Sequence, residues 1–176
     1  MYAEELVLEP EKILAKCNIK DIEDIADFGC GPGIFTIPLA RMTDGTIYCF
    51  DVLESALEAV KNRAHVMGLR NIVTKRSNLE KINGSGLQDG SVQHVVMRKI
   101  LLQNDSKDIL FAESYRVLKQ GGNLLVVGWG LDAVKGFGME KRLAPEAVVA
   151  LADQAGFSHT LEIEAGKYHY AYVFTK

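Results

Sequence analysis

Hydrophobic residues along this chain fall into short runs rich in Val, Ile and Phe, separated by longer stretches with helical spacing. This alternation predicts a Rossmann-like, doubly wound α/β fold, in which a mostly parallel sheet carries helices on both faces. Only Gly166-Lys167 separates the last two runs, which predicts an antiparallel hairpin at the end of the chain. The seven expected strands are Asp24–Phe28, Thr46–Asp51, Ile72–Arg76, Val92–Met97, Asn123–Trp129, Thr160–Ala165 and Tyr168–Thr175.

One helix is expected between the second and third strands. Ser55 and Glu58 have the spacing of a capping box, which predicts a helix that starts there and runs to about Met67. Gly68 suits the residue that closes such a helix. The expected apolar face of this helix consists of Ala56, Ala59, Val60, Ala64 and Met67.

Two further helices are expected in the second half of the chain. One begins at Asp105 or Ser106 and stops at the Gly121-Gly122 pair. The other follows Pro145, because proline suits the first turn of a helix. Ala144 precedes that proline and lacks the polar side chain that usually caps a helix start.

Composition and charge favour a single soluble domain. The chain has 176 residues, 48% of them hydrophobic and 24% charged, which is near the globular average and predicts one domain over residues 1–176. Residues 1–11 carry several glutamates and do not resemble a targeting signal, so a cytoplasmic protein without a membrane partner is expected. The net charge of -3 provides no general attraction to phosphate backbones, which disfavours nucleic acid as a partner.

The three cysteines predict no metal centre. Cys17, Cys30 and Cys49 are widely spaced and contain no C-x-x-C pair. No histidine lies near them at the spacing of metal ligands. We therefore expect neither a disulfide framework nor a zinc site.

The strongest chemical signal is the stretch Asp27-Phe28-Gly29-Cys30-Gly31-Pro32-Gly33 at the end of the first expected strand. Alternating glycines allow a tight turn that brings backbone N–H groups close to a ligand, and ligands of open α/β sheets bind at the carboxyl ends of the strands. A dinucleotide fingerprint counted from Gly29 would need a glycine where Ile34 stands. The spacing thus favours S-adenosylmethionine over NAD.

Asp51 ends the second expected strand and is a candidate ribose ligand. A carboxylate at this position can accept hydrogen bonds from both ribose hydroxyls. The alternative is an aspartate that caps the following helix. Val52 and Leu53 follow it, and they either pack on one face of an adenine ring or belong to the ordinary core.

Four stretches together resemble class I S-adenosylmethionine-dependent methyltransferases. They are Asp27–Gly33, Tyr48–Asp51, Asp89–Val92 and Arg116–Gly122. The resemblance covers nearly the whole chain and is closest to small single-domain members similar to the quinone-biosynthesis type. It implies that S-adenosylmethionine is the cofactor and that its methyl group passes to a small-molecule acceptor.

The same resemblance implies a cofactor site at the ends of the first, second and fourth strands. The glycine loop shapes the pocket for the methionine part, Asp51 binds the ribose, and Asn78 with Leu79 meets the adenine edge. Arg98 offers its backbone carbonyl to the cofactor's ammonium group. The residues expected at the cofactor are Asp27, Gly29, Cys30, Gly31, Gly33, Asp51, Val52, Asn78, Leu79 and Arg98.

Two neighbouring cations, Arg98 and Lys99, stand where the resembled family commonly has small or amide residues. Cations beside a sulfonium are unfavourable unless an anion is near. One interpretation is that Lys99 or Arg98 orients an anionic substrate. In the other, their side chains reach solvent or pair with an acid such as Asp105 or Glu113.

Methyl transfer from a sulfonium is an in-line displacement with an activated leaving group. Holding donor and acceptor in contact therefore supplies much of the catalysis, and the sequence assigns no catalytic residue. A general base would help a phenol, amine or thiol acceptor. The weak candidates for a catalytic role are Lys99, His94, Tyr168, His169 and Tyr170.

Two segments are candidates for closing over the site. The stretch from Trp129 to Arg142 contains Phe137 and Met139 among glycines, and it is either a substrate lid or an exposed connection. The segment before Pro10 is the second candidate. Neither interpretation is decided by the sequence.

The leading functional hypothesis is a small-molecule methyltransferase. The alternative is a non-catalytic protein that binds S-adenosylmethionine and acts as a regulatory partner, which the unusual Gln93, Arg98 and Lys99 leave open. The sequence does not identify the acceptor or the methylated atom. It also does not distinguish a monomer from a homodimer.

Overall fold

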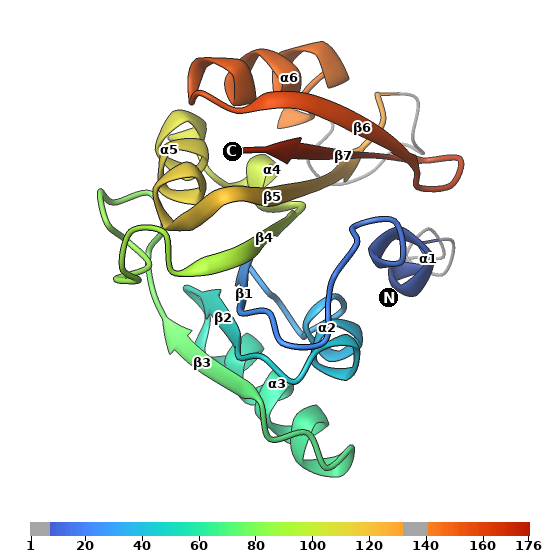
Figure 1. Ribbon diagram of the computed structural model, residues 1–176, viewed down its shortest axis with the longest axis vertical. Helices are drawn as coiled ribbons and strands as arrows, with labels where there is room; N and C mark the ends of the chain where they lie inside the picture. The colour runs from blue at the N-terminus through green and yellow to red at the C-terminus, as the bar shows by residue number, and fades with distance from the viewer. Residues whose placement is uncertain (1–7, 132–140) are drawn as a thin grey trace.

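A seven-stranded sheet forms the centre of the molecule in the computed structural model, which describes residues 8–131 and 141–176 (Figure 1). The strand order is β3-β2-β1-β4-β5-β7-β6. β1 to β5 pair in parallel, whereas β7 runs antiparallel to both β5 and β6. This confirms the expected sheet and its closing hairpin. The strands are β1 (Ile25–Phe28), β2 (Ile47–Asp51), β3 (Ile72–Arg76), β4 (Val92–Arg98), β5 (Leu118–Trp129), β6 (Ser158–Glu164) and β7 (His169–Thr175).

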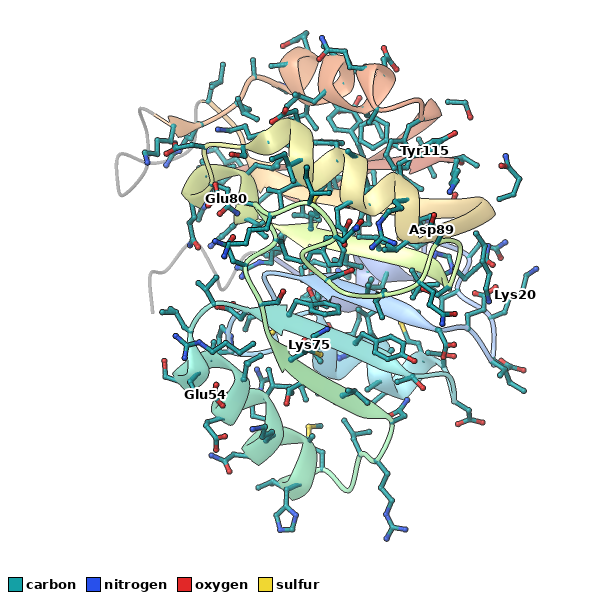
Figure 2. The ribbon with its side chains drawn as sticks, turned by 90° about the vertical axis from the view of Figure 1, so that its left-hand side faces the viewer. Lys20, Glu54, Lys75, Glu80, Asp89 and Tyr115 are labelled. Atoms are coloured by element: carbon teal, nitrogen blue, oxygen red, sulfur yellow. The ribbon has the colours of Figure 1, made fainter. Side chains whose placement is uncertain are left out.

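Helices cover both faces of this sheet and bury two apolar clusters. Alternate strand residues point to opposite faces, so Ile25 packs against the α1–α3 side and Ala26 against the α4–α6 side. Tyr115, labelled in Figure 2, belongs to α5. Its ring meets that of Phe157 edge to face, with 5.1 Å between ring centres. The helices are α1 (Pro10–Leu14), α2 (Thr36–Met42), α3 (Glu54–Val66), α4 (Ile100–Gln103), α5 (Lys107–Val117) and α6 (Pro145–Gln154).

The capping box expected at Ser55 is wrong, although the helix is present. α3 begins one residue earlier, at Glu54, and its N-cap is Leu53, which makes no side-chain capping bond. The carboxylate of Asp51 accepts the N–H of Leu53 at 2.9 Å and fixes this turn instead. The buried face of α3 includes Leu57, which the sequence prediction missed, whereas Met67 is exposed.

The expected helix stop at Gly121-Gly122 is also wrong. α5 ends at Val117, and the glycine pair lies within the first half of β5. A side chain at Gly122 would come within 2.8 Å of the carbonyl oxygen of Gln93 on β4, and Gly121 has a φ of +74°. The pair therefore permits a close approach of two strands where their register shifts.

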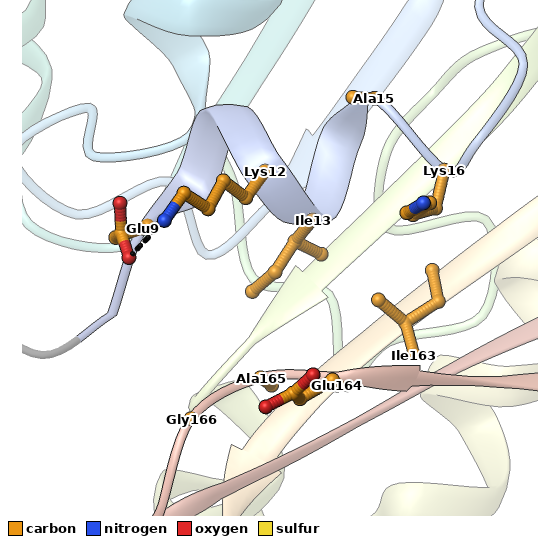
Figure 3. A pocket seen from close by; sticks show the side chains of 9 residues that line it. All are labelled: Glu9, Lys12, Ile13, Ala15, Lys16, Ile163, Glu164, Ala165 and Gly166. Carbon is orange, nitrogen blue, oxygen red and sulfur yellow. Dashed lines mark hydrogen bonds and ion pairs between the residues drawn. The ribbon is translucent and has the colours of Figure 1, made fainter.

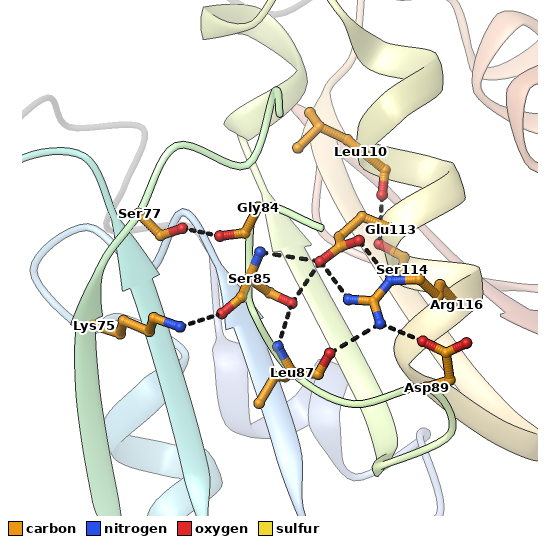
Figure 4. A network of polar contacts seen from close by, with 10 residues as sticks. All are labelled: Lys75, Ser77, Gly84, Ser85, Leu87, Asp89, Leu110, Glu113, Ser114 and Arg116. Atoms are coloured by element: carbon orange, nitrogen blue, oxygen red, sulfur yellow. Dashed lines mark hydrogen bonds and ion pairs between the residues drawn. The ribbon is translucent and has the colours of Figure 1, made fainter. Parts of the chain in front are cut away.

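A network of hydrogen bonds joins α5 to the segment before β4 (Figure 4). The buried carboxylate of Glu113 accepts two bonds from Arg116, at 2.8 and 2.9 Å, and two from the N–H and hydroxyl of Ser85. Arg116 also donates to Asp89 and to the carbonyl of Leu87. Burial alone would raise the pKa of Glu113, but the Arg116 and Ser85 bonds hold it below its ordinary value. Two stretches that carry the family resemblance thus meet in a structural network.

The described helices are all too short or too polar to span a membrane.

Candidate functional site

The glycine loop leaves the carboxyl end of β1, next to the point where the strand order reverses between β1 and β4. Gly29, Gly31 and Gly33 all have positive φ, from +53° to +83°, a region that favours glycine. A side chain at Gly29 would also come within 2.9 Å of Ile100 Cδ1. The carbonyl of Phe50 accepts the N–H groups of Gly29 and Cys30 at 2.8 and 3.0 Å. The loop is thereby held against β2.

Asp51 connects this loop to the start of α3. Its Oδ2 accepts the N–H of Gly31, and its Oδ1 accepts the N–H of Leu53, both at 2.9 Å. Each carboxylate oxygen has a second lone pair, so Asp51 can still accept ribose hydroxyls. The alternative interpretation, in which Asp51 caps the helix that follows, is wrong. The carboxylate accepts the N–H of Leu53, the residue before α3, and makes no capping bond to the helix itself.

Asp27 is buried beneath the glycine loop, with 1% of its surface exposed. The hydroxyl of Thr36 donates to its Oδ2 at 2.6 Å. Burial raises the pKa of Asp27 to about 6, while Thr36 and the nearby charge of Arg98 oppose that rise. Cys30 is buried as well, and a hydrogen bond with the Cys49 thiol together with burial raises its pKa.

A small cavity lies beside Asp51 at the carboxyl edge. It encloses about 40 Å³, far less than the roughly 300 Å³ of a typical ligand pocket, so a nucleoside would lie across its mouth or displace side chains. The sequence prediction missed four of its residues, Ser77, Ile100, Gln103 and Asn104, of which the last three follow β4. The lining consists of Gly29, Asp51, Val52, Ser77, Asn78, Leu79, Ile100, Gln103 and Asn104.

The residues expected near adenine differ in exposure. Val52 and Leu53 are 52% and 61% exposed, so the interpretation of both as ordinary core residues is wrong. Val52 lines the small cavity, whereas Leu53 does not. Leu79 is buried in the cavity wall, and exposed Asn78 accepts the N–H of Glu80 through its side-chain oxygen at 2.9 Å.

A second group of side chains gathers where β4, β5 and β7 meet at the same edge. The ammonium group of Lys99 lies 4.3 Å from the centre of the Trp129 ring, and the guanidinium carbon of Arg142 lies 5.5 Å from it. The ring of His169 packs on the same indole, 4.2 Å between centres. We call Lys99, Trp129, Arg142 and His169 the cationic–aromatic cluster.

The acids suggested as partners of Lys99 have other neighbours. Glu113 bonds Arg116, and Asp105 lies 4.0 Å from Lys141. The ammonium group of Lys99 lies over the Trp129 ring. The strand pattern places Lys99 and Trp129 at the same edge, but their contact depends on β4 and β5 being neighbours in the sheet. No pattern in the sequence singled out Arg142.

The remaining base candidates lie in different surroundings. His94 is buried near the amino end of β4, where its Nε2 lies 2.9 Å from Glu23, and burial lowers its pKa. Tyr170 is buried against Gly128, and burial raises its pKa to about 12. Tyr168 lies at the carboxyl edge, where its carbonyl accepts the N–H of Gly130 at 2.8 Å. Tyr168 and Tyr170 flank His169 of the cluster along the chain, whereas His94 lies toward the other end of β4.

A larger cavity of about 470 Å³ lies between α1 and the β6–β7 turn (Figure 3). Ile13 and Ile163 provide apolar walls, and Lys12, which is paired with Glu9 at 2.8 Å, lies at its rim with Lys16. No sequence pattern pointed to this cavity, because its two walls are far apart along the chain. Its volume falls within the usual range for small-molecule pockets.

Both segments considered as lids lie largely outside the described residues. Phe137 and Met139 belong to residues 132–140, and the segment before Pro10 is described only from Leu8. Within the described parts of the chain, no group of three or more potential ligands is placed to hold a metal ion.

Comparison with known proteins identifies related sequences and folds. A family model described as "Methyltransferase domain" matches residues 25–122. A "Ribosomal protein L11 methyltransferase" from Gloeobacter violaceus is 27% identical over 150 residues, which cover 85% of this chain but 41% of that protein. A "Probable cobalt-precorrin-6B C(15)-methyltransferase (decarboxylating)" from Saccharolobus solfataricus is 24% identical over 139 residues, covering 74% of this chain and 67% of that protein. This chain thus spans less than half of the ribosomal-protein relative.

Among solved structures, an S-adenosylmethionine-dependent methyltransferase from Aquifex aeolicus has a similar fold. The TM-score is 0.87 at 24% sequence identity, and the match covers 98% of this chain and 93% of the other. The likeness includes the closing antiparallel strands, because it extends over nearly the whole chain.

Proposed function

Because this chain belongs to the methyltransferase domain family, with S-adenosylmethionine as its cofactor, we propose that it methylates a small-molecule acceptor. The observation that carries the proposal is the Asp51 carboxylate, which holds the N–H groups of Gly31 and Leu53 at the mouth of the small cavity. Its remaining lone pairs suit the two hydroxyls of a ribose.

We assign the cofactor's parts to the site as follows. The ribose lies on Asp51, the adenine lies between Val52 and the Asn78–Leu79 turn, and the methionine part follows Gly29 to Gly33. The buried charge of Asp27 and the backbone carbonyl of Arg98 favour the cofactor's ammonium group. When bound, S-adenosylmethionine supplies an activated methyl group.

The chain's own contribution to the chemistry is positioning. The loop and Asp51 are fixed by backbone hydrogen bonds, so the donor is held in one orientation at the edge of the sheet. An acceptor beside it needs only to be aligned in line with the methyl group, an effect worth about 7 to 11 kcal/mol in well-oriented cases. No base is required when the acceptor atom is already nucleophilic.

The proposal of a small-molecule acceptor is supported by the share of each relative's length that this chain matches. The relative named for a cobalt-precorrin substrate is matched over 67% of its length, whereas the one named for ribosomal protein L11 is matched over 41%. The fuller match to the cobalt-precorrin relative favours a small molecule over a ribosomal protein as the acceptor. A closer kinship to quinone-biosynthesis enzymes, a single domain over residues 1–176 and a cytoplasmic location stay part of this proposal.

The net charge of -3 also argues against nucleic acid as the acceptor. The oligomeric state, monomer or homodimer, is left open by the described contacts.

A methyl-transfer assay tests the proposed function. The protein is incubated with methyl-labelled S-adenosylmethionine and fractionated metabolite extracts, and S-adenosylhomocysteine is measured as the common product. We expect at least one fraction to give turnover that is lost in Asp51→Ala. Tight binding of the cofactor without turnover in any fraction would instead favour the non-catalytic binding protein.

A further inference from the structure

We propose that Glu80 is a positioning residue for the cofactor, because its carboxylate joins the two walls of the small cavity at which we place the adenine. This inference rests on the proposed function, since it concerns the nucleoside end of the same site. Glu80, labelled in Figure 2, follows β3 and bonds the start of α5. It acts through the segments that it connects, not through contact with the reacting atoms.

The first wall of the cavity is the turn that follows β3. Asn78 and Leu79 line the cavity from this turn. The side-chain oxygen of Asn78 accepts the N–H of Glu80 at 2.9 Å, a bond that fixes the turn locally. Leu79 is buried, so its side chain anchors the turn in the core. The first wall therefore has a fixed position, and Glu80 extends from it.

The second wall is formed by residues 100–106 after β4, which we call the α4 segment. Ile100, Gln103 and Asn104 line the cavity from this segment. α4 itself has only four residues, Ile100–Gln103, which are too few for a helix that is stable on its own. The position of this wall therefore depends on the contacts that the segment makes with the rest of the molecule.

The Glu80 carboxylate holds the far end of the α4 segment. Its Oε1 accepts the N–H of Asp105 at 2.8 Å and that of Ser106 at 3.3 Å. Ser106 is the N-cap of α5, so the carboxylate also lies at the positive end of that helix. Hydrogen bonds from backbone N–H groups to a carboxylate are stronger than those between neutral groups. The two bonds connect the walls of the cavity directly.

The near end of the α4 segment packs on the glycine loop. A side chain at Gly29 would come within 2.9 Å of Ile100 Cδ1, and the side-chain amide of Asn104 donates to the carbonyl of Ile100 at 3.1 Å. Because the cavity encloses only about 40 Å³, the spacing of its walls decides how a flat purine ring fits. Without the Glu80 bonds, binding would also have to order the second wall, which costs affinity.

Titration calorimetry with S-adenosylhomocysteine and with adenosine tests this role. We expect Glu80→Ala to weaken the binding of both ligands about tenfold, because both contain the adenine and ribose. A loss confined to S-adenosylhomocysteine would place the effect at its amino-acid part. Unchanged affinities would show that the walls keep their spacing without Glu80. Either of these results would overturn the proposal.

Two further variants separate the hydrogen bonds from other effects. Glu80→Gln keeps an oxygen that can accept both N–H groups and removes only the charge, so we expect a smaller loss of about threefold. Glu146→Ala is the matched control, because it removes an acidic side chain from the first turn of α6, and Glu146 does not line the cavity. A loss of affinity in Glu146→Ala equal to that in Glu80→Ala would contradict the assignment.

Hydrogen exchange of the Asp105 and Ser106 amides measures the two bonds in the ligand-free protein. We expect both amides to exchange at least about tenfold faster in Glu80→Ala, and unchanged exchange would count against the connection. A purely structural role would lower the unfolding temperature and leave the affinities of the folded protein unchanged. The proposed function fails separately, through absence of S-adenosylhomocysteine binding in the wild-type protein. Failure of the present inference leaves that binding intact in every variant.

Discussion

The two sides of the carboxyl edge of this sheet are built in different ways. On the cofactor side, β1 and β2 carry glycines and two carboxylates, and the contacts run mainly through backbone N–H groups. On the neighbouring side, where we place the proposed acceptor and which we call the acceptor side, β4, β5 and β7 bring together long cationic and aromatic side chains from distant parts of the chain. Binding through backbone N–H groups depends on the spacing of residues along the chain. Binding through side chains depends on which strands lie side by side, and single substitutions alter it readily.

The two sides also differ in charge. Asp27 and Asp51 place two carboxylates at the proposed cofactor site, whereas Lys99 and Arg142 lie over the Trp129 ring. A cationic donor would thus meet a surface of opposite sign. Variants that disturb one side should leave the other side's ligand largely unaffected.

The largest expected effect is on packing behind the acceptor side. In Gly128→Ala, the new Cβ would lie 2.2 Å from the ring carbon and hydroxyl oxygen of Tyr170, in a buried environment. We expect a loss of about 3 kcal/mol in the free energy of unfolding, measured by urea denaturation. Gly130→Ala is the matched control, because the nearest atom there is 3.5 Å away. Similar effects of the two substitutions would show that Tyr170 does not fix this strand end.

The second prediction concerns the buried charge on the cofactor side. Because burial raises the pKa of Asp27 from 3.8 to about 6, the folded protein holds this proton more tightly than the unfolded chain does. The stability contribution of protonated Asp27 is complete at low pH and is lost as pH rises toward 6. Without ligand, we expect the stability of the wild type relative to Asp27→Asn to fall by about 2 kcal/mol between pH 4 and 7.

Urea denaturation of both proteins across this pH range measures the difference, and comparison with the variant cancels the other titrating groups. Asparagine keeps an oxygen that can accept the Thr36 hydroxyl, so the hydrogen bond is retained. A stability difference that does not change with pH would mean that folding does not raise the pKa of Asp27. Burial beneath the loop would then not disfavour the charged carboxylate, contrary to this account.

The smallest expected effect lies at α6, which packs against α5 behind the acceptor side. Its N-cap is Ala144, with extended backbone and no side-chain capping bond, followed by Pro145. We expect Ala144→Ser to raise the free energy of unfolding by about 1 kcal/mol, because a serine hydroxyl can accept a free N–H of the first turn. Ala144→Val is the control without an acceptor group. A gain from valine equal to that from serine would argue against capping.

Much of the cofactor side could be predicted from the sequence, because its signals are local. The strands around Asp27 and Asp51 were predicted to within a residue or two, and the glycine loop lies where the spacing placed it. The errors arose where residues that are typical of helix ends have another structural role. Gly121-Gly122 lets two strands approach instead of ending a helix, and Ser55 lies inside α3 because Asp51 already fixes the turn before it.

The acceptor side was predicted only in part. Lys99 was singled out as an unusual cation, but its contact with Trp129 depends on β4 and β5 lying side by side, and that with His169 depends on β7 inserting next to β5. His94 is not on this side of the edge, because it lies near the opposite end of β4. Single-residue patterns cannot show which strand ends share an edge.

The central claim is that Asp51 and the glycine loop bind S-adenosylmethionine, and ligand-dependent stability tests it most directly. Denaturation is measured for the wild type, Asp51→Ala and the control Asp153→Ala on α6, each alone and with S-adenosylhomocysteine or NAD. At 100 times its dissociation constant, S-adenosylhomocysteine should stabilise the wild type and Asp153→Ala by about 2.7 kcal/mol, and Asp51→Ala by much less. Equal stabilisation of Asp51→Ala, or stabilisation of the wild type by NAD alone, would contradict the account.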